Sequence, residues 1–482
     1  MPFKFYYILC RSVYRCLPCK FIIFPLKSST EYSKMFLWEV CGLEAKGYLE
    51  RVAFIMTDTQ GLFDLLTRGT SGSHGAAWVK ERLLEHGFRE LSMKEEWKLK
   101  RGERYLVHYC GSTLIAFTLG EDYRRGEGFR LGAAHTDFPC FKVKPNPEIV
   151  TKGYGKLNLE GYGGGIWSTW MDRPLSLAGR VALKSKDVFA PRIEYVDFYR
   201  PLMTIPNLAI HMNREVNKGI ELNKQTDLQP ILQYISEETD SRYFAELLAK
   251  ELSANTEDIL DYELTVYCRE EPCLIGAREE YISSPRLDNL TSVYGLTEGL
   301  VNGVRKRGIN VAAYFDHEEV GSRTKQGAAS LLLRDVLTKI LLALGEEEQN
   351  ILTSFYSSML LSLDVAHGLH PNQTGKMDPT NQPVLNEGFC IKESSQQSYA
   401  TDCEAVAILQ QICEGGNIPY QKFVNRSDLP GGSTLGAIAS TLLPIPTVDM
   451  GVPILAMHSA REFMGRRDME ALIDCVRSYF SL

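Results

Sequence analysis

Hydrophobic and polar positions follow a regular order in the carboxyl-terminal part of the chain. From residue 285 onward, segments with the 3.6-residue spacing of a helix alternate with short, almost wholly apolar segments typical of buried strands. This order predicts an α/β fold with a mostly parallel sheet covered by helices on both faces. The predicted helices are 289–303, 327–345, 399–414, 434–442 and 468–480, and the predicted strands are 310–316, 358–364, 420–425 and 445–449.

The preceding part of the chain extends this sheet and then changes character. Helical spacing covers 59–88, and strands are predicted at 104–110, 113–119 and 129–134. Between about 142 and 283, glycine clusters and short alternating strands replace the helix–strand order. We therefore predict one α/β domain that is interrupted by a strand-rich insertion. The predicted domain comprises 56–141 and 284–482, and the predicted insertion is 142–283.

The amino-terminal 55 residues differ from the rest of the chain. Basic residues punctuate short apolar stretches, and the first acidic residue is Glu31. The apolar runs are shorter than the roughly 7–15 residues of a signal peptide, so no secretion signal is predicted. Cys16 and Cys19 have the spacing of half a zinc site, but no second half lies nearby. We expect 1–55 to be a poorly ordered or misassigned extension, with Met56 as the alternative start.

Composition limits the classes of partner. The chain has 482 residues, 44% hydrophobic and 23% charged, which is ordinary for a globular protein. Its net charge of -7 and the absence of a basic stripe beyond the first 35 residues argue against nucleic acid. No apolar run approaches the roughly 20 residues of a membrane span. The cysteines after residue 55 are scattered singly, which predicts reduced thiols and a cytoplasmic location.

Polar residues stand where the predicted strands end. Glu318 and Glu319 follow the apolar run 311–315, and two adjacent side chains cannot both point into one core. An exposed turn is the usual explanation for such a pair. Unpaired carboxylates are costly to bury, so the alternatives are a cationic partner or a metal ion. Other strand ends and loops carry His135, Asp288, Asp364 and His458.

Each of these residues has an ordinary structural explanation when taken alone. Asp288 could cap a helix, Asp364 could end a turn, and His458 could be a core histidine. His135 and Asp137 project to the same side of an extended segment, so the carboxylate could orient the imidazole. Together they gather nitrogen and carboxylate ligands at one edge of one sheet, as zinc or a similar divalent ion prefers.

The chain lacks the His-Glu-x-x-His helix motif of single-metal peptidases and the Gly-x-Ser-x-Gly motif of serine hydrolases. Seven other segments are informative as a set: Ala134-His135-Thr136-Asp137, Gly163-Gly164-Gly165-Ile166-Trp167-Ser168-Thr169-Trp170, Leu208-Ala209-Ile210-His211, Pro285-Arg286-Leu287-Asp288-Asn289, Glu318-Glu319-Val320-Gly321-Ser322, Asp364-Val365-Ala366-His367 and Ala456-Met457-His458-Ser459-Ala460-Arg461-Glu462. In order and over about 57–482, these segments resemble the aspartyl aminopeptidase family of dinuclear zinc metallopeptidases.

The resemblance implies a role for each matching residue. Two zinc ions per subunit are implied, with Mn²⁺ or Co²⁺ as substitutes. The implied roles are His135 and Asp364 on one ion, Glu319 and His458 on the other, Asp288 bridging them, Glu318 as general base and acid, and Asp137 orienting His135. His211 would reach the active site of a neighbouring subunit, and Lys392 and Tyr399 would contact the substrate. Without the resemblance, Lys392 reads as a solvated surface lysine.

The implied activity is that of an aminopeptidase that removes Asp or Glu from peptides with a free amino terminus. The insertion would serve dimerisation and control access of substrate, and dimers would assemble into a homo-dodecamer. His317 departs from the family pattern, in which asparagine is frequent at this position. Two alternatives stay open. One is another enzyme with the same metal set, either a tetrahedral-type aminopeptidase, which could prefer neutral residues, or a deacylase. The other is a non-catalytic assembly protein on the same fold.

Overall fold

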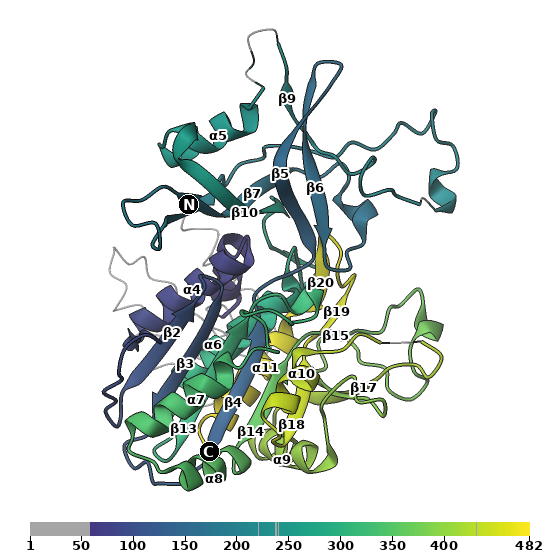
Figure 1. Ribbon diagram of the computed structural model, residues 1–482. Helices are drawn as coiled ribbons and strands as arrows, with labels where there is room; N and C mark the ends of the chain where they lie inside the picture. Colours follow the sequence, from purple (N-terminus) through teal and green to yellow (C-terminus); the bar gives the residue numbers. More distant parts are fainter. Residues whose placement is uncertain (1–57, 220, 237–238, 240, 430) are drawn as a thin grey trace, which may run out of the picture. The chain divides into compact units, whose positions relative to one another are not determined.

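The computed structural model describes residues 58–482, except 220, 237–238, 240 and 430 (Figure 1). The extension predicted at 1–55, with its cysteine pair, and the alternative start at Met56 lie outside the described residues. None of the helices in the described part is long and apolar enough to cross a membrane. The eight cysteines of that part are free thiols.

The largest of the sheets in the described residues has nine strands, in the order β1-β2-β3-β13-β4-β14-β18-β16-β17 (Figure 1). Five of its eight neighbouring pairs are parallel, which confirms the predicted mostly parallel sheet. The strands are β1 (Phe88–Glu90), β2 (Arg104–Tyr109), β3 (Thr113–Leu119), β4 (Phe129–His135), β13 (Ile309–Phe315), β14 (Met359–Leu363), β16 (Phe389–Glu393), β17 (Tyr420–Val424) and β18 (Thr447–Gly451).

Helices cover both faces of this sheet. One core contains side chains from α4 (Gly72–Glu85), α6 (Leu287–Asn302), α9 (Cys403–Gly416) and α11 (Arg466–Tyr479). The core on the opposite face contains side chains from α7 (Leu332–Ala343), α8 (Glu348–Tyr356) and α10 (Leu435–Leu442).

Strand β13 shows why the central strands are mostly apolar. Val311, Ala313 and Phe315 belong to the core of α7, whereas Ala312 and Tyr314 belong to the core of α6. Because successive side chains point to opposite faces, a strand buried on both sides needs apolar residues on both faces. The exception, Asn310, is buried and donates to the Phe480 carbonyl at 2.8 Å.

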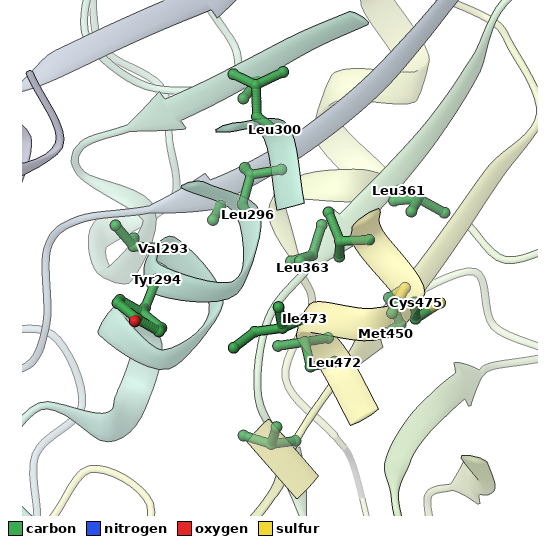
Figure 2. Close-up of a cluster of buried hydrophobic side chains, with 14 of the residues drawn as sticks. Val293, Tyr294, Leu296, Leu300, Leu361, Leu363, Met450, Leu472, Ile473 and Cys475 are labelled. Atoms are coloured by element: carbon green, nitrogen blue, oxygen red, sulfur yellow. The ribbon is translucent and has the colours of Figure 1, made fainter. Parts of the chain in front are cut away.

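Close packing of α6 and α11 completes the first core (Figure 2). Leu296 of α6, Leu363 of β14 and Leu472 of α11 are fully buried there. Each such leucine contributes about 1.5–3 kcal/mol through burial. Gly299 of α6 allows the close approach, because a Cβ at that position would overlap Val476 of α11. The carboxyl-terminal helix α11 therefore packs tightly against α6 on this face of the sheet.

The structure corrects some of the predicted elements. The helix expected at 327–345 begins only at Leu332, because 327–331 form turns. Helix α8 and strand β16 were absent from the sequence prediction. β16 interrupts its apolar pattern with Lys392 and Glu393, so hydrophobic periodicity does not reveal it.

A six-stranded antiparallel sheet lies within residues 140–268, in the order β8-β7-β10-β5-β6-β9. Its core includes Phe141, Val266 and Phe244, the last from helix α5 (Tyr243–Leu252). We propose that this sheet and α5 form the inserted domain. The strands are β5 (Cys140–Thr151), β6 (Tyr154–Tyr162), β7 (Leu175–Leu183), β8 (Arg192–Asp197), β9 (Ile231–Tyr234) and β10 (Ile259–Cys268).

A third sheet of five short strands runs in the order β11-β12-β20-β19-β15. Its connections include the segment from β12 into the first turn of α6, the link from β14 to β15, and the turn from β19 to β20. These three segments carry Asp288, Asp364 and His458 respectively. The strands are β11 (Cys273–Ile275), β12 (Tyr281–Ser284), β15 (Ala366–His367), β19 (Pro453–Leu455) and β20 (Glu462–Gly465).

Candidate metal centre

Three adjacent parallel strands bring one half of the predicted site together. β4 lies between β13 and β14, and His135 is paired with Phe315 where β4 and β13 end. Beyond β13, a 3₁₀ turn (Glu318–Val320) carries the two glutamates. Asp364 follows β14 directly. The carboxyl ends of parallel strands lie at one edge of a sheet, so these side chains meet.

The other half comes from the five-stranded sheet. Asp288 lies in the first turn of α6, where its backbone departs from helical geometry. The residue in the capping position of that helix is Arg286, so Asp288 is not the cap. His458 lies in the turn between β19 and β20 with a positive φ of 67°. Nδ1 of His458 lies 3.0 Å from the carbonyl oxygen of Gly164, which orients the ring.

The two oxygens of Asp288 face two different sets of side chains. Asp288 Oδ1 lies 3.7 Å from His135 Nε2, which is itself 3.6 Å from Asp364 Oδ1. Asp288 Oδ2 lies 3.2 Å from His458 Nε2, which is 3.5 Å from Glu319 Oε1. Two groups with suitable spacing for a metal ion therefore share one carboxylate. A pair of divalent ions with a bridging carboxylate needs this arrangement.

Burial and charge indicate that the cluster fits cations. Asp288 Oδ1 is buried and accepts no hydrogen bond from the described residues. Burial and the Asp288 carboxylate raise the pKa of Glu319 well above its usual range, although His458 opposes the shift. Burial is also the largest cause that raises the pKa of Glu318 to about 8. Bound divalent cations would neutralise this crowding of carboxylates, and the mixed nitrogen and oxygen donors suit zinc.

Asp137 makes more contacts than the sequence predicts. Its carboxylate accepts hydrogen bonds from the backbone N–H groups of Glu318 and Glu319, both at 3.1 Å, and from the Tyr162 hydroxyl at 2.6 Å. His135 Nδ1 lies 3.4 Å from Asp137 Oδ1 and 3.0 Å from the Asp137 carbonyl oxygen. Although burial opposes it, the hydrogen bond with His135 lowers the pKa of Asp137. Asp137 therefore joins the loop of the glutamates to the imidazole.

Lys392 is buried, so its interpretation as a surface lysine is wrong. Only 2% of the residue is exposed, and its Nζ lies 3.4 Å from Asp364 Oδ2. The same Nζ donates to the Val365 carbonyl at 3.1 Å and lies 5.0 Å from the centre of the Tyr399 ring. Although burial opposes it, the Lys392 charge lowers the pKa of Asp364. Tyr399 is likewise buried.

A pocket of about 480 Å³ opens over the cluster. Its lining includes the five predicted metal ligands, Glu318, Lys392 and Tyr399. It also includes residues to which the sequence assigned no role, among them His367, Thr434 and Met457. Of these, His367 stands in a family-like segment three residues after Asp364, which is the signal that could have identified it. His211 is not among the lining residues and lies in an exposed loop between β8 and β9.

Comparison with known proteins shows which family the chain resembles. Residues 65–480 match the family described as aminopeptidase I zinc metalloprotease (M18). A probable M18 family aminopeptidase 2 of Clostridium acetobutylicum is 43% identical over 409 residues, which cover 84% of this chain and 94% of the relative.

Two solved structures extend the comparison. A cryo-EM structure of an Ape4 and Nbr1 complex matches with a TM-score of 0.86 and 35% identity, covering 89% of this chain and 86% of that one. The S. cerevisiae mApe1 dodecamer matches with a TM-score of 0.77 and 22% identity, covering 89% of this chain and 97% of the other. At 22% identity, the match to the mApe1 dodecamer shows a shared fold.

Proposed function

The chain belongs to the aminopeptidase I zinc metalloprotease (M18) family, and on that premise we propose that it removes amino-terminal Asp or Glu residues from peptides by means of two zinc ions. A metallo-aminopeptidase activity follows from the family itself. The proposal adds the acidic preference, the number of ions and the residues that bind them. One ion is assigned to His135 and Asp364, the other to Glu319 and His458, with Asp288 shared.

The observation that carries this proposal is the position of Asp288. Its two oxygens face separate ligand groups, and one of those oxygens is buried without a hydrogen-bond partner among the described residues. A buried carboxylate oxygen in that state is costly unless a cation neutralises it. Two zinc ions would supply an activated water of lowered pKa and a Lewis acid for the scissile carbonyl.

Glu318 is the proposed general base and acid. It lines the pocket beside the ligand groups, and its backbone N–H is fixed by the Asp137 carboxylate. Its raised pKa reflects burial among carboxylates, and bound cations would lower that pKa again. Glu318 would take a proton from the attacking water and deliver it to the leaving amine. A positioned base of this kind typically contributes about 10²–10⁴-fold to the rate.

Lys392 is the proposed determinant of acidic preference. It is a buried cation at the pocket wall, and Tyr399 lies beside it. An acidic substrate side chain that reached Lys392 would gain a charge-assisted hydrogen bond in a partly desolvated site. The alternative of a neutral preference has support from the same contacts, because Lys392 already pairs with Asp364 and the Val365 carbonyl.

His211 is proposed to act in an assembly of subunits. It is exposed in the single chain and does not reach the pocket, while neighbouring residues of its loop, Leu208 and Met212, expose apolar side chains. The mApe1 structure is a dodecamer, and we propose a dimer-based homo-dodecamer here as well. In that assembly His211 would enter a neighbouring site and donate to the developing oxyanion. The free thiols support the proposed cytoplasmic location.

The test combines metal analysis with a substrate panel. Purified protein is analysed for zinc and assayed with chromogenic Asp, Glu and Leu substrates, in parallel with Lys392→Met. The proposal predicts two zinc ions per subunit and Asp or Glu cleaved at least tenfold faster than Leu, with that ratio reduced in the variant. Faster cleavage of Leu by the wild type would establish the neutral alternative. Zinc without hydrolysis of any substrate would support a non-catalytic assembly protein.

A further inference from the structure

Glu462 is a buried carboxylate behind the metal centre. It begins β20 and lies opposite Ser284 at the end of β12, four residues before Asp288. Only 2% of the residue is exposed. Its Oε2 accepts the backbone N–H of Asp288 at 2.9 Å, and its Oε1 accepts the backbone N–H of His458 at 2.7 Å. One side chain therefore joins two backbone segments that carry metal-site residues.

The two segments need such a connection because neither residue is held by a strand at its own position. Asp288 has non-helical backbone angles inside the first turn of α6. Ala456 and His458 both have positive φ values, a conformation that side-chain-bearing residues adopt only when the surroundings enforce it. By contrast, His135 is the last residue of β4, and the N–H of Asp364 bonds to the Met450 carbonyl of the neighbouring strand.

Both amides bonded by Glu462 belong to the same ligand group. Asp288, Glu319 and His458 form that group. The two further groups are His135, Asp288 and Asp364, and His135, Glu318 and Glu319. Both hydrogen bonds are accepted by the buried Glu462 side chain, so the loss of either would leave a backbone N–H without its partner. Two such bonds from one side chain restrict the distance between the Asp288 and His458 backbones.

We propose that Glu462 is a positioning residue that sets the affinity of the ion held by Asp288, Glu319 and His458. This inference rests on the two-metal site of the proposed function. Glu462 touches neither substrate nor ion; it acts through the backbones of two ligands. Outer groups that orient metal ligands typically change metal affinity by about 10–100-fold when they are removed.

Asp468 offers a matched control within the same chain. It is also a buried carboxylate, and its two oxygens accept the backbone N–H groups of Asn386 and Gly388, each at 2.8 Å. Neither amide belongs to a proposed metal ligand. Asp468→Asn therefore removes the same kind of double hydrogen bond from a neighbouring part of the fold, and it reports the cost of such a loss to stability alone.

The experiment is a titration of metal-free protein with Zn²⁺ in the presence of a competing chelator, together with thermal unfolding of the metal-free forms. The wild type is expected to bind two ions per subunit. Glu462→Gln should weaken one site by about 10–100-fold and leave the other within about threefold, because an amide can accept only one of the two N–H bonds. Asp468→Asn should leave both affinities within about threefold of the wild type, whatever its effect on unfolding temperature.

Three results would overturn the inference. These are unchanged affinities in Glu462→Gln, equal weakening of both sites in that variant, and selective weakening of one site in Asp468→Asn. A wild type that binds a single ion would instead remove the two-metal proposal, and the inference with it.

Glu462→Asp provides a second variant in case the amide does not fold. It retains the charge but is one methylene shorter, so it cannot reach both amides without movement of the backbone. The same selective loss at one site is expected. Unchanged zinc affinities in Glu462→Asp would overturn the inference equally well.

Discussion

The nine-stranded sheet and the six-stranded sheet serve the same site in different ways. The nine-stranded sheet places His135, Glu318 and Asp364 directly at or just beyond the ends of its strands. The six-stranded sheet contributes groups that contact His458 or Asp137 and are not proposed to bind metal themselves. The Tyr162 hydroxyl at the end of β6 donates to Asp137, and the Gly164 carbonyl just beyond it contacts His458 Nδ1.

This difference follows from how each sheet is buried. Parallel strands covered by helices on both faces end at one protected edge, where few polar groups are tolerated without partners. The antiparallel sheet has exposed positions along its strands, such as Tyr154 and Tyr195. Its exposed positions are available for contacts at the surface, while Tyr162 at the end of β6 donates to Asp137. We expect substitutions in the first sheet to have larger effects than substitutions in the second.

The largest effect is expected for Asp288→Ala. Both ligand groups lose their shared carboxylate, so neither ion keeps a complete set of donors. We predict loss of both tightly bound zinc ions and a fall in kcat/KM of at least about 10⁴-fold, as two metal functions disappear together. Zinc analysis and steady-state kinetics measure this. Asp335→Ala on the exposed surface of α7 is the control and should retain both ions. Retention of two ions by Asp288→Ala would contradict a bridging role.

Glu318→Gln should separate proton transfer from metal binding. The amide has the shape of the carboxylate but cannot accept the proton, while the backbone bond to Asp137 remains. We predict two bound zinc ions and a fall in kcat of about 10²–10⁴-fold with little change in KM. Zinc content and KM are the internal controls. A variant that turns over at the rate of the wild type would exclude Glu318 as the base.

The elements that the sequence predicts best are the buried strands of the nine-stranded sheet, which consist mainly of apolar residues. β4, β13 and β14 are predicted to within one residue at each end, because their apolar runs are too short for helices and are bounded by polar or turn residues. The polar residues that follow such runs then indicate the edge where the site lies. His135, Glu318, Glu319 and Asp364 do lie at that edge. Asp288 and His458 were expected at the same edge but come from segments of the five-stranded sheet, although all six side chains lie together.

Residues whose role depends on long-range contacts could not be predicted in this way. Burial of Lys392 is possible because its Nζ donates hydrogen bonds to the Asp364 carboxylate and the Val365 carbonyl, which lie in another segment of the chain. Tyr162 and Glu462 look like ordinary polar residues of strands. Their bonds to Asp137 and to the Asp288 amide join residues that are 25 and 174 positions apart, so no local period or spacing reveals them.

His317 shows a case where the backbone explains a departure from the pattern that the resemblance implies. Its φ is 63°, a left-handed conformation that asparagine adopts more readily than other residues with side chains. Histidine is also enriched there, and its Nδ1 lies 2.9 Å from Thr324 Oγ1. The sequence alone shows the substitution but not the conformation that makes it acceptable.

His211→Phe should lower the rate without releasing metal. The residue lies on the six-stranded side of the molecule and would act only on a neighbouring subunit. Removal of one donor to an oxyanion typically costs about 10²–10³-fold in kcat, and we predict an effect in this range with two zinc ions retained. Kinetics and zinc analysis of the assembled protein measure this. Dissociated wild-type subunits are the control, and full activity in them would contradict action between subunits.

Tyr162→Phe is expected to have the smallest effect and tests whether the second sheet supports the site at all. The variant loses one hydrogen bond to the Asp137 carboxylate, whose two backbone donors remain. A hydrogen bond to a charged group contributes about 1.5–3 kcal/mol to folding. We predict a loss of that size in the free energy of unfolding and at most a tenfold fall in kcat/KM. Tyr154→Phe, at the exposed start of the same strand, is the matched control. Equal losses of stability in the two variants would show that the Tyr162 hydroxyl gives the site no specific support. The two sheets would then differ only in that the nine-stranded sheet carries proposed metal ligands and the six-stranded sheet carries none.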